Sequence, residues 1–370
     1  MGESNTINRP IAHIERTIIS AMRHNKSALG LAILLVLLGF VCVFSLATGA
    51  VAIPPSQVIA VLGHQLQVSL PWDFEPRHHA ILISIRLPRV LLGILIGGGL
   101  AISGAAMQGL FRNPLADPGL IGVSSGAAVA AVAVIVLGSS ALDFATLALG
   151  PFALSLAAFG GGAATTFLVY SLSLVHGRVA VSTMLLAGIA VNAMAGAITG
   201  IFTFVADDAQ LRSLTFWSLG SLGGATWPTV GATAPLIGFS TLAVLRYARP
   251  LNVLLLGEDE AGHLGYRVER LKRSLVLLVA IAVGAAVAVA GIIGFVGLIV
   301  PHLLRITLGP DNRFLLPGSV LLGASLLVGA DTIARVLVAP AELPIGIVTA
   351  IIGGPFFMYL LQRGRRLGRY

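Results

Sequence analysis

Apolar residues occur in long blocks along this 370-residue chain, and short polar segments separate the blocks. A helix needs roughly 20 apolar residues to cross about 30 Å of hydrocarbon. We therefore predict an all-α integral membrane protein of about ten transmembrane helices. The predicted helices are 28–48, 89–111, 119–138, 145–173, 181–205, 229–247, 272–291, 301–309, 315–338 and 346–362.

The block at 301–309 is too short to span a bilayer by itself. The preceding segment, Gly291-Ile-Ile-Gly294-Phe295-Val296-Gly297, is rich in glycine, which weakens helices. Together they predict a broken helical region inside the bundle. Because irregular backbone at membrane depth persists only where protein or a water-filled cavity satisfies its polar groups, this region is a candidate wall of a pathway.

The apolar run from Ala28 to Leu46 exceeds the roughly 7–15 residues of a signal-peptide core. We interpret it as the first membrane helix, although Ala50-Val51-Ala52 resembles a cleavage site. Residues 1–27 then form an N-terminal cytoplasmic extension, 28–363 a ten-helix membrane domain, and 364–370 a basic tail.

The composition agrees with burial in lipid. Hydrophobic residues make up 56% of the chain and charged residues 10%, whereas a soluble protein carries roughly 25% charged residues. Many of the 44 glycines lie inside the apolar blocks, which indicates tight helix packing, either at specific interfaces or at scattered contacts. The single cysteine, Cys42, excludes an intrachain disulfide.

The net charge of +8 does not indicate a nucleic-acid partner. The basic residues instead concentrate on one side of the membrane, as expected for the cytoplasmic side of a membrane protein. With the N-terminus inside, 18 of the 23 basic residues fall on the inner side, and both termini are cytoplasmic. The outer side keeps Arg77, Arg86, Arg89, Arg212 and Arg335.

The longest inner connection, from Arg246 to Arg273, forms either short helices against the inner face or a solvated loop. The chain has no GxxxxGK[ST] phosphate loop, so any ATP must bind to another chain.

Several segments resemble, in order, the FecCD-type permeases, the membrane subunits of type II ABC importers for cobalamin, haem and ferric siderophores. The matching segments are Arg86-Leu-Pro-Arg89, Ala101-Ile-Ser-Gly-Ala-Ala-Met-Gln108, Asn113-Pro-Leu-Ala-Asp-Pro-Gly-Leu-Ile-Gly122, Leu185-Leu-Ala-Gly188, Gly294-Phe-Val-Gly-Leu-Ile-Val-Pro-His-Leu-Leu-Arg305, Leu316-Pro-Gly318 and Ala341-Glu-Leu-Pro-Ile-Gly346. The segment from Asp207 to Gly224 looks most like haem permeases.

This resemblance implies a BtuC-like permease fold, a homodimer in membrane lipid, two ATP-binding ATPase subunits and an external substrate-binding protein. The chain itself is then a transport subunit of the bacterial inner membrane, not an enzyme. Its expected substrate is an iron chelate, most closely haem, with ferric siderophore and cobalamin as alternatives. An ion-coupled secondary transporter is a rival from a different class.

The resemblance also implies site residues. Arg86, Arg89 and Arg335 match positions that dock the binding protein, and interfacial snorkelling is the plain alternative. Ser182 and Thr183 match the cytoplasmic gate, and helix N-caps are the alternative. The inner segment 249–266 would couple to the ATPase through the residues Gly257, Glu258, Ala261, Gly262, Leu264 and Gly265.

Three amides, Gln108, Asn113 and Asn192, are possible pathway residues, although amides in membrane helices commonly bond neighbouring helices. Asp331 lies four residues before Arg335, which predicts a local ion pair. We expect no resident metal or cofactor, and we interpret His302 as a histidine bonded within the bundle.

Overall fold

The computed structural model describes residues 8–68, 70–138, 142–339 and 341–366. Within these residues, seven helices are long and apolar enough to cross a membrane, and three shorter apolar helices accompany them. The predicted all-α membrane architecture is therefore confirmed. Residues 1–7 of the predicted extension and 367–370 of the predicted tail lie outside the described residues.

The main helices of the bundle are α1 (Asn8–Ala47), α4 (Leu87–Leu110), α5 (Val123–Leu137), α7 (Ala153–Leu172), α8 (Val181–Val205), α10 (Trp227–Leu245), α13 (Val268–Ala290), α14 (Val296–Thr307), α15 (Asn312–Leu337) and α16 (Ile345–Arg366). The connecting helices are α2 (Pro55–Gln65), α3 (Pro76–Ile81), α6 (Asp143–Leu149), α9 (Asp208–Leu219), α11 (Ala248–Leu254) and α12 (Glu258–His263). A π-helical turn (Leu82–Arg86), two 3-10 turns (Pro118–Ile121 and Gly150–Phe152) and the strands β1 (Leu174–Val175) and β2 (Arg178–Val179) complete the fold.

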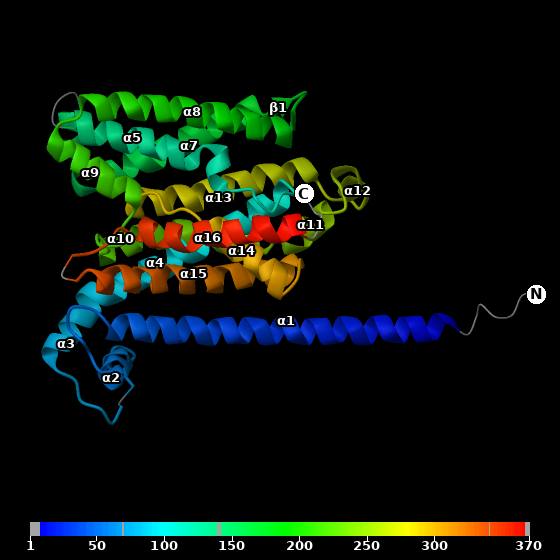
Figure 1. The fold of residues 1–370 in the computed structure, drawn as a ribbon, viewed down its shortest axis with the longest axis horizontal. Helices are drawn as coiled ribbons and strands as arrows, with labels where there is room; N and C mark the ends of the chain where they lie inside the picture. Colours follow the sequence, from blue (N-terminus) through cyan, green and yellow to red (C-terminus); the bar gives the residue numbers. More distant parts are fainter. Residues whose placement is uncertain (1–7, 69, 139–141, 340, 367–370) are drawn as a thin grey trace, which may run out of the picture.

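The main helices run roughly parallel to one another (Figure 1). Helices α2, α3 and α9 lie at one end of the bundle, which we call the α9 end (Figure 1). The β1–β2 hairpin and helices α11 and α12 lie at the opposite end, which we call the α12 end. Helix α1 follows the outside of the bundle and continues well past the α12 end (Figure 1).

Helix α4 forms the centre of the bundle, where it packs against α10, α13, α14 and α15. Glycine makes these contacts possible. A Cβ at Gly104 would lie 1.8 Å from the carbonyl oxygen of Gly297, and a Cβ at Gly97 would lie 2.4 Å from that of Gly323. The predicted tight packing through glycine is confirmed at these two contacts.

The predicted broken helical region is confirmed between α13 and α14. Residues 291–294 are not helical, and Phe295, just before α14, has a φ of 69°. The predicted start of the second piece at 301 is wrong, because α14 begins at Val296 and holds Pro301 in its interior. Proline cannot donate to the carbonyl four residues before it. The side-chain amide of Gln108 instead donates to the Gly297 carbonyl at 3.4 Å.

The block predicted as one helix over 145–173 contains two helices, α6 and α7. The turn Gly150–Phe152 separates them, and Gly150 has a φ of 53°, in the region that favours glycine.

Candidate functional site

Arg89 belongs to a largely buried charge cluster at the α9 end, in which only the Glu342 side chain is substantially exposed. Its guanidinium lies 2.9 Å from a carboxylate oxygen of Asp331 and 2.9 Å from one of Glu342. Asp331 also pairs with Arg335 at 3.1 Å, so the predicted helical ion pair is confirmed. These four residues, which we call the outer charge cluster after the predicted orientation, join α4 to α15 and to the segment before α16.

Arg86 and Arg335 also hold the C-terminal end of α1. Arg86 donates to the carbonyl of Leu46 at 2.5 Å and to that of Val51. Arg335 donates to the hydroxyl of Ser45 at 2.8 Å and to its carbonyl at 3.3 Å. Cations stabilise a helix C-terminus, because the last carbonyls there lack partners within the helix.

The three arginines predicted to dock a binding protein are therefore brought together, but they are turned into the protein. Arg86 is 5% exposed and Arg89 is 9% exposed. This differs from a free docking cation and also from a snorkelling one, whose charge reaches water. Docking stays a prediction. Asp331, Glu342 and the α1 carbonyls are distant in sequence from Arg86 and Arg89, and no local pattern indicated them.

The inner segment folds into two short helices, α11 and α12, so of the two alternatives the short helices are confirmed. Gly257 and Gly265 flank α12 with φ values of 135° and 85°, which favour glycine. Ala261, within α12, is buried, while Leu264 is 60% exposed.

Gly262 faces open space, because no atom lies within 4 Å of a Cβ built there. Glu258, at the start of α12, pairs with Lys272 at 2.6 Å. The segment thus presents an accessible surface at the α12 end, and its coupling role stays a prediction.

Ser182 and Thr183 lie in the first turn of α8, at the α12 end. The N-cap of α8 is Ala180, so the alternative interpretation of these two hydroxyls as N-caps is wrong. Within the described residues, neither hydroxyl has a hydrogen-bond partner, and Ser182 is exposed. The gate assignment stays a prediction, but these polar groups are free to take part in one.

Each of the three amides predicted for a pathway forms hydrogen bonds within this chain. Gln108 is buried and accepts from Arg305 in addition to its bond to Gly297. Asn192 bonds Ser125 at 2.5 Å, which connects α8 to α5. Asn113 accepts from the Leu115 amide in a turn. In this conformation Gln108 and Asn192 bond neighbouring segments and Asn113 bonds its own turn, and a pathway role stays a prediction.

The broken helical region lines a cavity of about 480 Å³. The lining residues come from three segments: Ser218 and Leu219; Ile292, Gly294 and Phe295; Gly346, Ile347, Ala350 and Ile351. They belong to the end of α9, to the break before α14 and to the first turns of α16. Sequence reasoning identified only the middle segment, because its glycines were the one signal visible locally.

His302 packs edge-on against Phe356, with ring centroids 6.3 Å apart. Its buried Nδ1 has no hydrogen-bond partner among the described residues, so the expectation of a histidine bonded within the bundle is wrong at this atom. Those residues contain no group of three or more His, Cys, Asp and Glu side chains placed to hold a metal ion.

A multi-helix membrane bundle with a cavity beside a broken helix is the architecture of a membrane transport protein. The chain belongs to the FecCD transport family, whose family model matches residues 35–363. It is 50% identical over 286 residues to the hemin transport system permease protein HmuU of Yersinia pestis, which covers 77% of this chain and 84% of that protein.

Two further relatives define the class. The cobalamin import system permease protein BtuC of Halobacterium salinarum is 47% identical over 279 residues, covering 75% of this chain and 72% of that protein. A metal-chelate type ABC transporter solved in an inward-facing conformation is 30% identical, with a TM-score of 0.78, covering 90% of this chain and 98% of that chain. The predicted family is confirmed, and the chain is a permease of an ABC importer.

Proposed function

We propose that this permease moves haem, or a closely related iron chelate, into the cytoplasm across the bacterial inner membrane. The identity of 50% with a hemin permease carries this proposal. A cobalamin permease is 47% identical to this chain, so cobalamin is an alternative substrate. Ferric siderophore is a further alternative.

The permease acts as a homodimer in lipid. Exposed apolar side chains on α8 and α16 support this assembly: Ile201 is 65% exposed, Phe204 91% and Ile351 67%. Ile351 also lines the cavity beside the broken region. A second copy against α16 would enclose that cavity and shield it from lipid.

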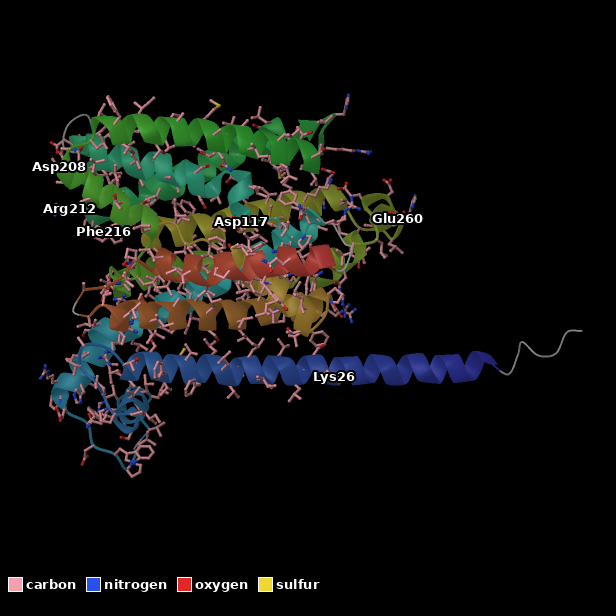
Figure 2. The ribbon with its side chains drawn as sticks, viewed as in Figure 1. Lys26, Asp117, Asp208, Arg212, Phe216 and Glu260 are labelled. Atoms are coloured by element: carbon pink, nitrogen blue, oxygen red, sulfur yellow. The ribbon has the colours of Figure 1, made fainter. Side chains whose placement is uncertain are left out.

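The α12 end is cytoplasmic, and so are both termini. Lys26 and Glu260 lie toward this end, while Asp208, Arg212 and Phe216 lie at the other (Figure 2). Two ATPase subunits dock on the coupling segment 249–266, since the chain has no phosphate loop. Ser182 and Thr183 form the gate near this end, and Gln108, Asn113 and Asn192 become pathway residues only when the helices move apart.

An external binding protein docks at the α9 end, above Arg86, Arg89 and Arg335. Because these cations already have partners, its carboxylates would add to or replace the bonds to Asp331 and Glu342. Residues 1–27, 28–363 and 364–370 serve as cytoplasmic extension, permease domain and basic tail.

Uptake by proteoliposomes tests the function. The chain is reconstituted with its ATPase and its binding protein, and uptake of haemin, cobalamin and a ferric siderophore is compared with and without ATP. We expect ATP-dependent haemin uptake, which an ATPase lacking its phosphate-binding lysine abolishes. Uptake of cobalamin without uptake of haemin would show that cobalamin, and not haem, is the substrate. Uptake driven by a proton or sodium gradient without the ATPase would contradict an ABC importer.

A further inference from the structure

Lys272 is a buried lysine that does not line the cavity beside the broken helical region. It lies in the second turn of α13 and is 2% exposed. The other basic residues of the same region, Arg267, Arg270 and Arg273, are all exposed. A buried ammonium is costly unless its donors are paired, so its partners identify what it holds together.

The ammonium of Lys272 has three partners from three elements. It lies 2.6 Å from Glu258 at the start of α12, 3.2 Å from Glu269 on its own helix, and 2.8 Å from the backbone carbonyl of Val179 in β2. Glu269 in turn accepts from the Val179 amide at 2.8 Å. Lys272 therefore binds the backbone carbonyl of Val179, and Glu269 binds the backbone amide of the same residue. We call Lys272, Glu258 and Glu269 the inner charge cluster.

Val179 stands directly before the gate helix. Ala180 is the N-cap of α8, and Ser182 follows in its first turn. Glu258 begins α12, which belongs to the segment that meets the ATPase. The inner charge cluster is thus a short, bonded connection between the ATPase-facing helix and the backbone at the start of the gate helix.

We propose that Lys272 is a positioning residue that transmits movement of α12 to the N-terminus of α8, an inference that rests on the proposed function. When the ATPase subunits close, α12 shifts and carries Glu258 with it. Lys272 must then follow Glu258 or release it, and either response changes the support of the Val179 backbone. The gate residues, three and four positions beyond Val179, move as a result.

The test measures the gate directly. Ser182→Cys in a Cys42→Ala background is placed in the complete importer, and cross-linking between the two subunits is compared in nucleotide-free and ATP-trapped states. Couplings between sites typically correspond to about 5–150-fold, so Lys272→Met should reduce the nucleotide-dependent change in cross-linking at least about 5-fold. Haemin transported per ATP hydrolysed should fall by a similar factor.

Three further variants make the result specific. Lys272→Arg, which keeps the cation, should restore part of the response, and Arg273→Met, which removes an exposed cation of the same turn, should leave it unchanged. If Lys272→Met fails to assemble, Glu258→Gln decides, because this carboxylate is 37% exposed and can be neutralised without leaving an empty buried site. A full gate response in Lys272→Met, or in Glu258→Gln where the first does not assemble, would overturn the proposal. An unmodified chain that binds no ATPase and shows no nucleotide response would instead contradict the proposed function.

Discussion

The outer and inner charge clusters lie at opposite ends of the protein and differ in what they join. The outer cluster connects α4 to α15, and these two helices pack against each other in the core. The inner cluster connects α12 and β2, both short peripheral elements, to the foot of α13. One cluster therefore reinforces helices that are already packed, while the other is a main connection between elements with few other contacts.

The two clusters also differ in the type of cation and in the exposure of its carboxylate partners to water. Arg89 binds Asp331 through a planar fork of two nitrogens, and the Asp331 side chain is 4% exposed. Lys272 offers a single ammonium to carboxylates that are 37% and 41% exposed. A buried bidentate pair fixes the relative position of its two side chains, whereas a single ammonium beside hydrated carboxylates can exchange partners. We infer that the outer cluster holds structure and the inner cluster transmits movement.

The largest expected effect comes from removing the carboxylate at the centre of the outer cluster. Asp331→Ala leaves Arg89 and Arg335 beside each other without their shared partner, and removing one member of a buried pair costs about 3–5 kcal/mol. We expect a large fall in thermal stability of the purified protein in detergent. Glu342→Gln is the matched control, because Glu342 is 45% exposed and should contribute no more than about 1 kcal/mol. Equal effects of the two variants would remove the special role of Asp331.

The second prediction distinguishes two roles of Arg86 and Arg335, which are holding the end of α1 and docking the binding protein. Arg86→Gln with Arg335→Gln removes the charged hydrogen bonds to the end of α1, but the glutamine amides can still donate to part of the same acceptors, so we expect a net loss of about 1.5–3 kcal/mol. The thermal stability should therefore fall. If the arginines also dock the binding protein, its association rate should fall at low salt, and the difference should shrink as salt rises. An unchanged association rate with lowered stability would leave only the structural role.

A smaller effect is expected from crowding the contact between α4 and α14. Gly104→Ala would place a methyl group against the Gly297 backbone, and overpacking typically costs about 1–3 kcal/mol. Gly196→Ala in α8 is the matched control, since nothing lies within 4 Å of a Cβ there. Thermal unfolding of the two variants gives the comparison, and similar midpoints would contradict the close approach.

The smallest effect on stability should come from the α12 end. No atom lies within 4 Å of a Cβ built at Gly262, so the free energy of unfolding of Gly262→Arg should stay within about 0.5 kcal/mol of the original. ATP-driven haemin uptake should nevertheless fall strongly, because the added side chain would obstruct the ATPase. Normal uptake with correct membrane insertion would remove this segment from the coupling site.

The sequence predicted the long apolar helices and the break before α14, because apolar block length and glycine content are local signals, but it did not predict the start of α14 at Val296 or the division of 145–173 into two helices. It also predicted the pair between Asp331 and Arg335, which is one helical turn. It could not predict that Arg89 binds Glu342, or that Lys272 holds Val179, because these contacts join residues far apart in the chain. The contacts of Arg86 and Arg335 with the end of α1 could not be predicted for the same reason, because the Leu46 carbonyl and Ser45 lie far from them in the chain.

We expect the α12 end to move with nucleotide state while the outer charge cluster stays fixed. Pulsed electron paramagnetic resonance on the reconstituted dimer tests it most directly, with spin labels at Ser182→Cys or, in a second sample, at Thr226→Cys near the α9 end, both in a Cys42→Ala background. We predict that the distance between the two Ser182 labels changes on ATP binding, and that the distance between the two Thr226 labels changes much less. An unchanged distance at Ser182 in every nucleotide state, or a larger change at Thr226, would contradict the account.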